Sequence, residues 1–352
     1  MNISRWIFGL VAGIIFTSCK PTTQLQVIQP AAIDLPDHIE TLAIIDRSKP
    51  RSGFINALEG GFTGEAINQD KEGRRRAIEV LTATLTRTPR FRVVQTRLEY
   101  TGSETGSSMV DPLPWREIER ISQDFEASAV IALEMFDSDN HIQTDMRKRK
   151  RKDDEGNEYE ETVFDARERV VVKLGWRIYD VKTQTVIDEV TVQDEQSDSR
   201  SGLKTEKQAL AELQDPRTLT FRVSEQAGEK YAERIAPIWI MVSRTFFKKS
   251  KGPESADMER AARFFETDKW DDAARIWQDI LNKRSASAEV KGMATYNLAV
   301  ASEKNGLLDS ALEWAQRSYG EFGNKKARAY VETIQRRIED QQRLERQLKG
   351  RT

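Results

Sequence analysis

The fold of the first half of the chain is decided by TLAIID, residues 41–46. A short, unbroken apolar run between polar residues is typical of a β-strand that is buried on both faces. Two further apolar runs follow, at 91–95 and 129–136, and apolar residues at helical spacing occupy 71–86 and 114–125 between them. This β-α-β-α-β order predicts parallel strand pairing with right-handed crossovers.

The next part of the chain changes character. Residues 170–179 alternate apolar and polar side chains, which predicts a half-exposed antiparallel strand, and residues 186–192 return as its hairpin partner. A long helix is predicted over Thr220–Phe247, with a kink at Pro237. Lys248–Glu254 is expected to be a linker at a domain boundary.

Residues 137–162 carry six consecutive basic residues, Arg147–Lys152, followed by acidic ones. The segment is expected to be a long solvated hairpin or a disordered loop, whose two signs of charge nearly cancel. The basic run lacks interleaved aromatic residues and the net charge of the chain is −2, so no nucleic-acid partner is expected. Contact of a basic tip with lipid headgroups or an anionic polymer is a weaker alternative.

The remainder is expected to be wholly helical. Apolar residues recur at helical spacing in three successive stripes, and 325–348 forms a final, highly charged helix whose apolar positions fade toward its end, as in a capping helix. Two groups of small and large residues carry a repeat pattern: Ala261, Phe264, Trp270, Ala273, Trp277 and Ile280; and Leu298, Ala299, Gly306, Leu308, Ala311, Ala315 and Ser318.

These positions resemble tetratricopeptide repeats, in which Ala at the helix crossing permits close packing. The resemblance implies a concave groove that binds peptides, and two repeats would need helix 220–247 or the last helix to complete the stack. Asn297 falls where some such domains use Asn to hold a peptide backbone, although the basic residues of that clamp do not appear at matching positions. The alternative is a generic helical bundle. The groove residues implied are Phe265, Tyr296, Asn297, Val300 and Glu303.

The first domain resembles the N-terminal domain of TolB and the core of the curli secretion lipoprotein CsgG. The resemblance rests on the order of TLAIID, FRVVQ, SAVIALEMF, VVKLGWRIYD and TVIDEVTV over residues 39–193. It implies an α/β domain with a mixed sheet. A secretion pore would need alternating apolar membrane hairpins here, whereas 137–169 is charged. The whole chain also resembles a family of lipoproteins of Gram-negative bacteria, which implies location and architecture but no activity.

The N-terminus has the pattern of a secretory signal. Arg5 precedes the apolar run 6–16, which is shorter than the roughly 20 residues that span a bilayer. Phe16-Thr17-Ser18-Cys19 resembles a bacterial lipobox, which implies a lipidated Cys19; the alternative is a plain secretory signal with a free cysteine. Each buried methylene contributes roughly 0.8 kcal/mol, so several acyl chains form a stable anchor. Lys20 in place of Asp favours the outer membrane, with the protein facing the periplasm.

Few residues in the chain have the chemistry of a reactive site. Cys19 is the single cysteine and His38 and His141 are the two histidines, so we expect no disulfide, no thiolate or histidine metal site and no catalytic triad. The Gly-rich loop 53–65 follows the first strand, where parallel sheets bind ligands, but it matches neither GxGxxG nor a P-loop. It is expected to be a flexible connection or a partner contact.

The carboxylates of the chain do not indicate a metal or catalytic site either. Asp137, Asp139 and Asn140 lack the Gly and the terminal Glu of a calcium loop and are expected to form a solvated turn. Glu134 has no acid or base partner that the sequence shows. No catalytic residue, cofactor or metal site is therefore predicted.

Together these features predict four segments: a signal peptide at 1–18, a tether at 19–38, an α/β domain with a long closing helix at 39–250, and a tetratricopeptide-like helical domain at 254–348. We expect a non-enzymatic, lipid-anchored scaffold or assembly factor that binds envelope proteins or peptides through its helical domain. The alternative is an accessory subunit of a secretion or transport complex, with a CsgG-like oligomerising domain that is not itself a pore. An envelope enzyme acting on glycan or peptide is the third hypothesis, and the oligomeric state is open.

Overall fold

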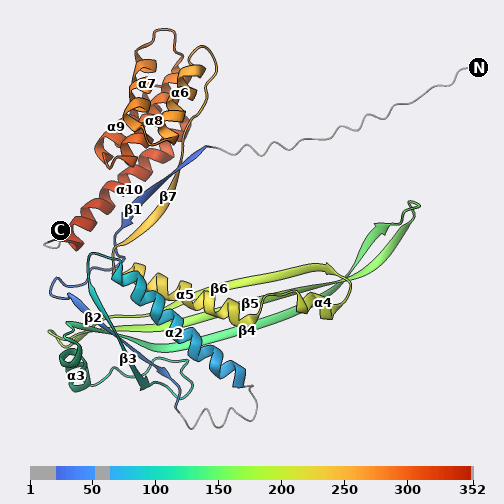
Figure 1. Cartoon of the computed structure of the whole chain (residues 1–352), viewed down its shortest axis with the longest axis vertical. Coiled ribbons are helices and arrows are strands. Elements are labelled where there is room, and N and C mark those ends of the chain that lie inside the picture. The colour runs from blue at the N-terminus through green and yellow to red at the C-terminus, as the bar shows by residue number, and fades with distance from the viewer. Residues whose placement is uncertain (1–20, 52–63, 350–352) are drawn as a thin grey trace, which may run out of the picture. The chain divides into compact units, whose positions relative to one another are not determined.

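The computed structural model describes residues 21–51 and 64–349, which form two compact units (Figure 1). The first, here called the α/β unit, contains residues 28–239 and those from 341 onward. The second, here called the helical unit, contains the described residues up to 27 and 240–340. Cys19, the signal segment and loop residues 53–63 lie outside the described residues. In the parts of the chain that the structure describes, no helix combines the length and apolar content needed to cross a bilayer.

The α/β unit is built on a five-stranded sheet with the order β3-β2-β4-β5-β6. Its elements are β2 (Thr41–Lys49), α2 (Gly64–Thr86), β3 (Arg92–Thr101), α3 (Trp115–Phe125), β4 (Ala129–Lys152), β5 (Glu158–Asp180), β6 (Thr185–Leu203), α4 (Glu206–Ala211) and α5 (Pro216–Ile235). Strand β2 pairs in parallel with both β3 and β4, while β4, β5 and β6 pair antiparallel. The predicted mixed α/β fold and its parallel strands are confirmed.

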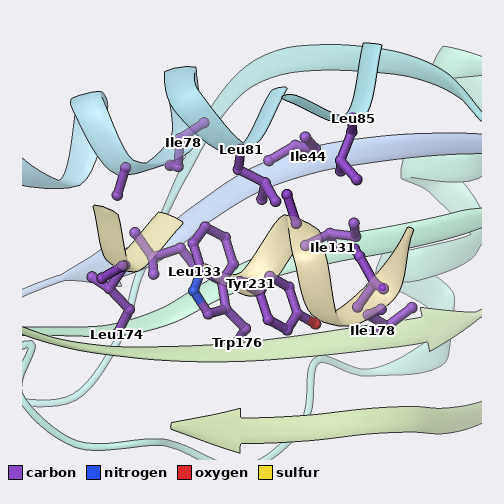
Figure 2. Packing of buried hydrophobic residues seen from close by; sticks show 14 of the residues in the cluster. Ile44, Ile78, Leu81, Leu85, Ile131, Leu133, Leu174, Trp176, Ile178 and Tyr231 are labelled. Atoms are coloured by element: carbon purple, nitrogen blue, oxygen red, sulfur yellow. The ribbon is translucent and has the colours of Figure 1, made fainter. Parts of the chain in front are cut away.

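Helices α2 and α5 cover one face of this sheet, and α3 packs on the other. The centre of the first face is a stack of Trp176 and Tyr231, whose ring centroids lie 4.9 Å apart and whose ring planes are nearly parallel (Figure 2). The other face is also covered where a loop crosses β5: a Cβ at Gly175 would lie 2.3 Å from Sδ of Met109. Because both faces are buried, the prediction of a half-exposed strand at 170–179 is wrong.

The helix predicted over 220–247 is confirmed as far as Ile235, where α5 ends, and its continuation through a kink at Pro237 is wrong. Proline lacks an N–H and disfavours the helical conformation in the residue before it, and Ala236, before Pro237, is extended, with φ −139° and ψ 147°. Strand β7 (Ile238–Thr245) follows and pairs with β1 (Thr22–Gln29). The tether predicted over 19–38 therefore contains a strand, and its alternating apolar residues include the buried Leu25.

The charged segment 137–162 is the long hairpin of β4 and β5, so the hairpin prediction is confirmed and the disordered alternative is wrong. Its register places Arg149, Lys150 and Lys152 of the basic run opposite Glu161, Glu160 and Glu158 of β5. Lys148 lies 3.1 Å from Glu160. This cross-strand ladder neutralises much of the basic run, which removes the main support for contact with an anionic surface.

The helical unit contains five helices, all within the described residues: α6 (Ser255–Glu266), α7 (Trp270–Asn282), α8 (Ala288–Lys304), α9 (Leu308–Gly320) and α10 (Lys325–Gln347). Their buried faces form one apolar cluster that includes Trp277 and Ile334. The last helix begins and ends close to the predicted bounds, but its final residues belong to the α/β unit. There Gln347 accepts a hydrogen bond from N of Ala31 at 2.9 Å and donates one to its carbonyl oxygen at 3.1 Å.

Candidate functional site

The five predicted groove residues lie together in the helical unit, on α6 and α8. Helix α8 begins after Ser287, whose hydroxyl accepts a hydrogen bond from N of Val290. Its helical spacing then brings Tyr296, Asn297, Val300 and Glu303 to the interior of the unit, and all four are buried, as is Phe265 on α6. They do not line an open peptide groove, because residues 244–247 of the chain itself lie against them.

Asn297 holds the backbone of that segment. Its Oδ1 accepts a hydrogen bond from N of Phe247 and its Nδ2 donates one to the carbonyl oxygen of Phe247, both at 2.7 Å. The side chain is 0% exposed. Since an amide side chain has one acceptor and two donors, it pairs with a peptide group as a neighbouring strand would. Asn297 therefore binds an extended backbone that belongs to its own chain.

Glu303 holds the side chain of Arg244. The Nε and Nη2 atoms of Arg244 each donate to one carboxylate oxygen of Glu303 at 2.8 Å, and the hydroxyl of Tyr330 donates to the same carboxylate at 2.6 Å. Nε of Arg337 lies 3.8 Å away. Burial alone would lower the pKa of Arg244, but its hydrogen bonds to Glu303 raise that pKa above its ordinary value. Burial and the neighbouring carboxylate raise the pKa of Tyr330.

Two aromatic side chains complete the contact. The ring of Phe246 meets that of Phe265 edge-on at 5.2 Å, and N of Phe246 donates to the carbonyl oxygen of Pro21 at 3.1 Å. The ring of Phe247 lies 5.4 Å from Tyr296, with the ammonium of Lys326 4.5 Å above it. Backbone, cation and two rings are thus each recognised by separate groups, which is the chemistry of peptide binding.

A second candidate is a 540 Å³ pocket in the α/β unit, between α2 and the carboxyl-terminal ends of β2 and β3. Parallel sheets bind ligands at this edge, and Arg97 on its wall has a φ of 60°, which is strained for a residue other than Gly. Arg75 on the helix side pairs with Glu72 and Glu79. Because basic and acidic side chains alternate around the pocket, its lining selects no class of ligand.

Sequence reasoning missed a buried polar network around Glu134. The Glu134 carboxylate accepts hydrogen bonds from Nη1 of Arg47 at 2.9 Å and from the hydroxyl of Tyr179 at 2.7 Å, and lies 3.1 Å from Nη1 of Arg177. Burial and Glu134 raise the pKa of Tyr179. Arg177 also donates to the carbonyl oxygen of Val110, so the network fastens the loop before α3 to the sheet. Glu134 is far in sequence from Arg47 and from the neighbouring Arg177 and Tyr179, so no local pattern could have revealed the network.

The two histidines lie elsewhere in the chain, outside both candidate sites. His38 contacts both carboxylate oxygens of Asp180 at 2.9 Å. Burial alone would raise the pKa of Asp180, but the hydrogen bonds from His38 and Thr183 lower it below its ordinary value. His141 lies within β4, opposite Arg169.

Asp137, Asp139 and Asn140 are part of β4, so the predicted turn is wrong. Both aspartates lie within 4.0 Å of Nζ of Lys173. Among residues 21–51 and 64–349, no three His, Cys, Asp or Glu side chains are arranged to hold a metal ion.

The chain thus combines a mixed α/β unit with a helical unit whose interior holds an extended segment of the same chain. The chain belongs to the family described as "Domain of unknown function (DUF8603)", whose model matches residues 39–247, more than half of the 352 residues. Residues 259–336 match a second family model, described as "Domain of unknown function (DUF6340)". No curated protein matches the chain.

The similarity of the chain to solved structures is distant. A protein described as a neuraminyllactose-binding hemagglutinin homolog from Helicobacter pylori is 11% identical, with a TM-score of 0.27, over 58% of this chain and 86% of that one. A PelC dodecamer from Paraburkholderia phytofirmans is 12% identical, with a TM-score of 0.22, over 61% and 99%. TolB from Acinetobacter baumannii is 10% identical, with a TM-score of 0.21, over 60% and 31%. Scores this low carry no argument about function.

Proposed function

We propose that this chain is a non-enzymatic, lipid-anchored protein of the cell envelope that holds partner proteins, with the helical unit as its recruiting part. The observation that carries the proposal is the extended segment 244–247, bound in the groove through both its backbone and its side chains. A surface that recognises an extended chain in this way is suited to binding peptide segments of other proteins.

The anchoring part of the proposal rests on the lipobox-like residues 16–19. A Cys19 that carries several acyl chains would attach the protein stably to a bilayer without a spanning helix. Lys20 in place of Asp favours the outer membrane, with the fold in the periplasm. Radiolabelled fatty acid incorporated into the chain, but not into a Cys19→Ala variant, tests this part directly.

The recruiting part is tested by photo-crosslinking in intact cells. A photoreactive phenylalanine analogue replaces Phe322, which lines a 320 Å³ pocket together with Phe247. The matched control places the same analogue at Tyr159, an exposed aromatic residue of the β4–β5 hairpin. We expect an adduct with a specific envelope protein at Phe322 and not at Tyr159.

The other outcomes discriminate among the hypotheses. Adducts with a partner at Tyr159 alone would assign recruitment to the α/β unit. Adducts between copies of this chain at Tyr159 would favour the alternative function, an oligomerising subunit of a secretion or transport complex. Absence of any adduct at either position would remove the support for a scaffold.

A further inference from the structure

We propose that Arg244-Thr245-Phe246-Phe247 is an internal stand-in for a partner peptide, and that the groove accepts an extended segment with a basic residue followed two and three positions later by aromatic residues. This inference rests on the proposed function, and it identifies the partner by the chemistry that the groove recognises. The chain's own copy of this pattern occupies the groove, so a partner must replace it.

The backbone contact determines the conformation of the occupant. Asn297 uses one acceptor and one donor on the peptide groups of Phe247. Any residue with a free N–H satisfies this pair, whereas proline at this position does not. The contact therefore requires an extended backbone and excludes proline, but it does not otherwise select the side chain.

The charge contact selects the basic residue. The side chain of Glu303 is 1% exposed, and a buried carboxylate without a cation is strongly unfavourable. Arg244 satisfies both oxygens with two parallel N–H groups, which a lysine ammonium does not reproduce in the same planar geometry. An occupant with a neutral or acidic residue at this position would leave Glu303 with only Tyr330 and the more distant Arg337.

The aromatic contacts select the next two side chains. Phe246 is buried against Phe265, which in turn meets Trp277 at 5.6 Å. Phe247 is only partly buried, between Tyr296 and Lys326, and the 320 Å³ pocket lies beside it. The first aromatic position is therefore restricted in size, while the second has room for a larger ring such as tryptophan.

The internal segment lowers the apparent affinity for any partner. Strand β7 ends at Thr245, and residues 246–254 contain no helix or strand before α6 begins. A tethered segment competes for the groove at a high effective concentration. A partner can therefore bind only the fraction of molecules whose groove is open, which weakens its apparent affinity. Weakening the internal segment should therefore strengthen binding of a peptide supplied from outside.

The test uses the full chain and a fluorescent peptide of residues 243–248, SRTFFK. Arg244→Glu places a second carboxylate beside Glu303 and should open the groove, whereas the matched control Arg244→Lys keeps the cation. We expect fluorescence anisotropy to show at least tenfold tighter peptide binding to Arg244→Glu than to the unaltered chain or to Arg244→Lys. A peptide with Glu in place of its arginine should not bind any of them.

Equal binding to all three proteins, or no binding to a folded Arg244→Glu variant, would overturn the inference. If that variant does not fold, hydrogen exchange of the unaltered chain decides instead. Excess peptide should speed exchange at the amides of Phe246 and Phe247, and unchanged rates would refute displacement. A crosslinked envelope partner at Phe322 without peptide binding would defeat this inference alone. Peptide binding without such a partner would defeat only the envelope role.

Discussion

The ion pair of Arg244 and Glu303 gives the sharpest test of the groove. Removing one partner of a buried ion pair costs about 3–5 kcal/mol. Arg244 retains 15% exposure and Arg337 lies within 3.8 Å of Glu303, so the lower end of that range applies. We expect Arg244→Met and Glu303→Gln each to destabilise the helical unit by about 3 kcal/mol.

The double variant should lose little more than either single variant, because each single change already leaves the other partner without its counter-charge. The coupling energy from the double-mutant cycle should therefore be about 2–3 kcal/mol. Because the chain has two units and need not unfold in one step, the suitable assay is hydrogen exchange resolved to peptides of α8.

The control is the pair of Lys248 and Glu266, which has a similar separation of 3.0 Å but side chains that are 42% and 39% exposed. The same cycle there should give a coupling energy of about 0–1 kcal/mol, as for other solvated pairs. If the coupling of Arg244 and Glu303 is no larger than this control, the segment is not held in the groove by charge, and the reasoning about its occupant fails.

Three further predictions concern the α/β unit. Gly228→Ala should lower the urea midpoint by an amount equivalent to about 1–2 kcal/mol, because its Cβ would lie 2.5 Å from the carbonyl oxygen of Ala77 on α2, which outweighs the gain in helix propensity; a more stable variant would contradict this. Arg97→Gly should stabilise by about 0.5 kcal/mol through relief of its positive φ, and Arg97→Ala should not. Asp180 has a lowered pKa, so its contribution is present above its ordinary value of 3.8 and is lost as pH falls through the lower folded value. Asp180→Asn should cost about 1–3 kcal/mol at pH 7 and reduce the dependence of stability on acid pH, whereas an unchanged pH profile would show that the bond to His38 is not stabilising.

The parts of the fold that the sequence predicts are those with local signals. The run at 41–46 is apolar on both faces because helices cover both sides of β2, and Pro114 marks the start of α3. The error at 220–247 arose because the apolar residues of β7 also fit a helical spacing when Pro237 is taken as a kink. In the structure the proline ends the helix, and IWIMVSRT alternates as a strand.

The candidate site was predicted in part for the same reason. The resemblance to helical repeats placed Tyr296, Asn297 and Glu303 together, since their spacing along one helix is local information. The occupant was not predictable, because Arg244 and Phe247 were assigned to a helix and their contacts depend on residues 50 or more positions away. Long-range contacts of this kind have no counterpart in local periodicity.

The pairing of Gln347 with Ala31 has a consequence for biosynthesis. All residues of the helical unit precede position 341, but the α/β unit still needs residues from 341 onward. A ribosome therefore completes the helical unit before it has made the last segment of the α/β unit. A chain shortened by about ten residues at its C-terminal end would keep the helical unit whole and lose both hydrogen bonds to the backbone of Ala31. A fusion tag placed at that end would therefore perturb the α/β unit, although the residues that precede it, 325–347, form a helix.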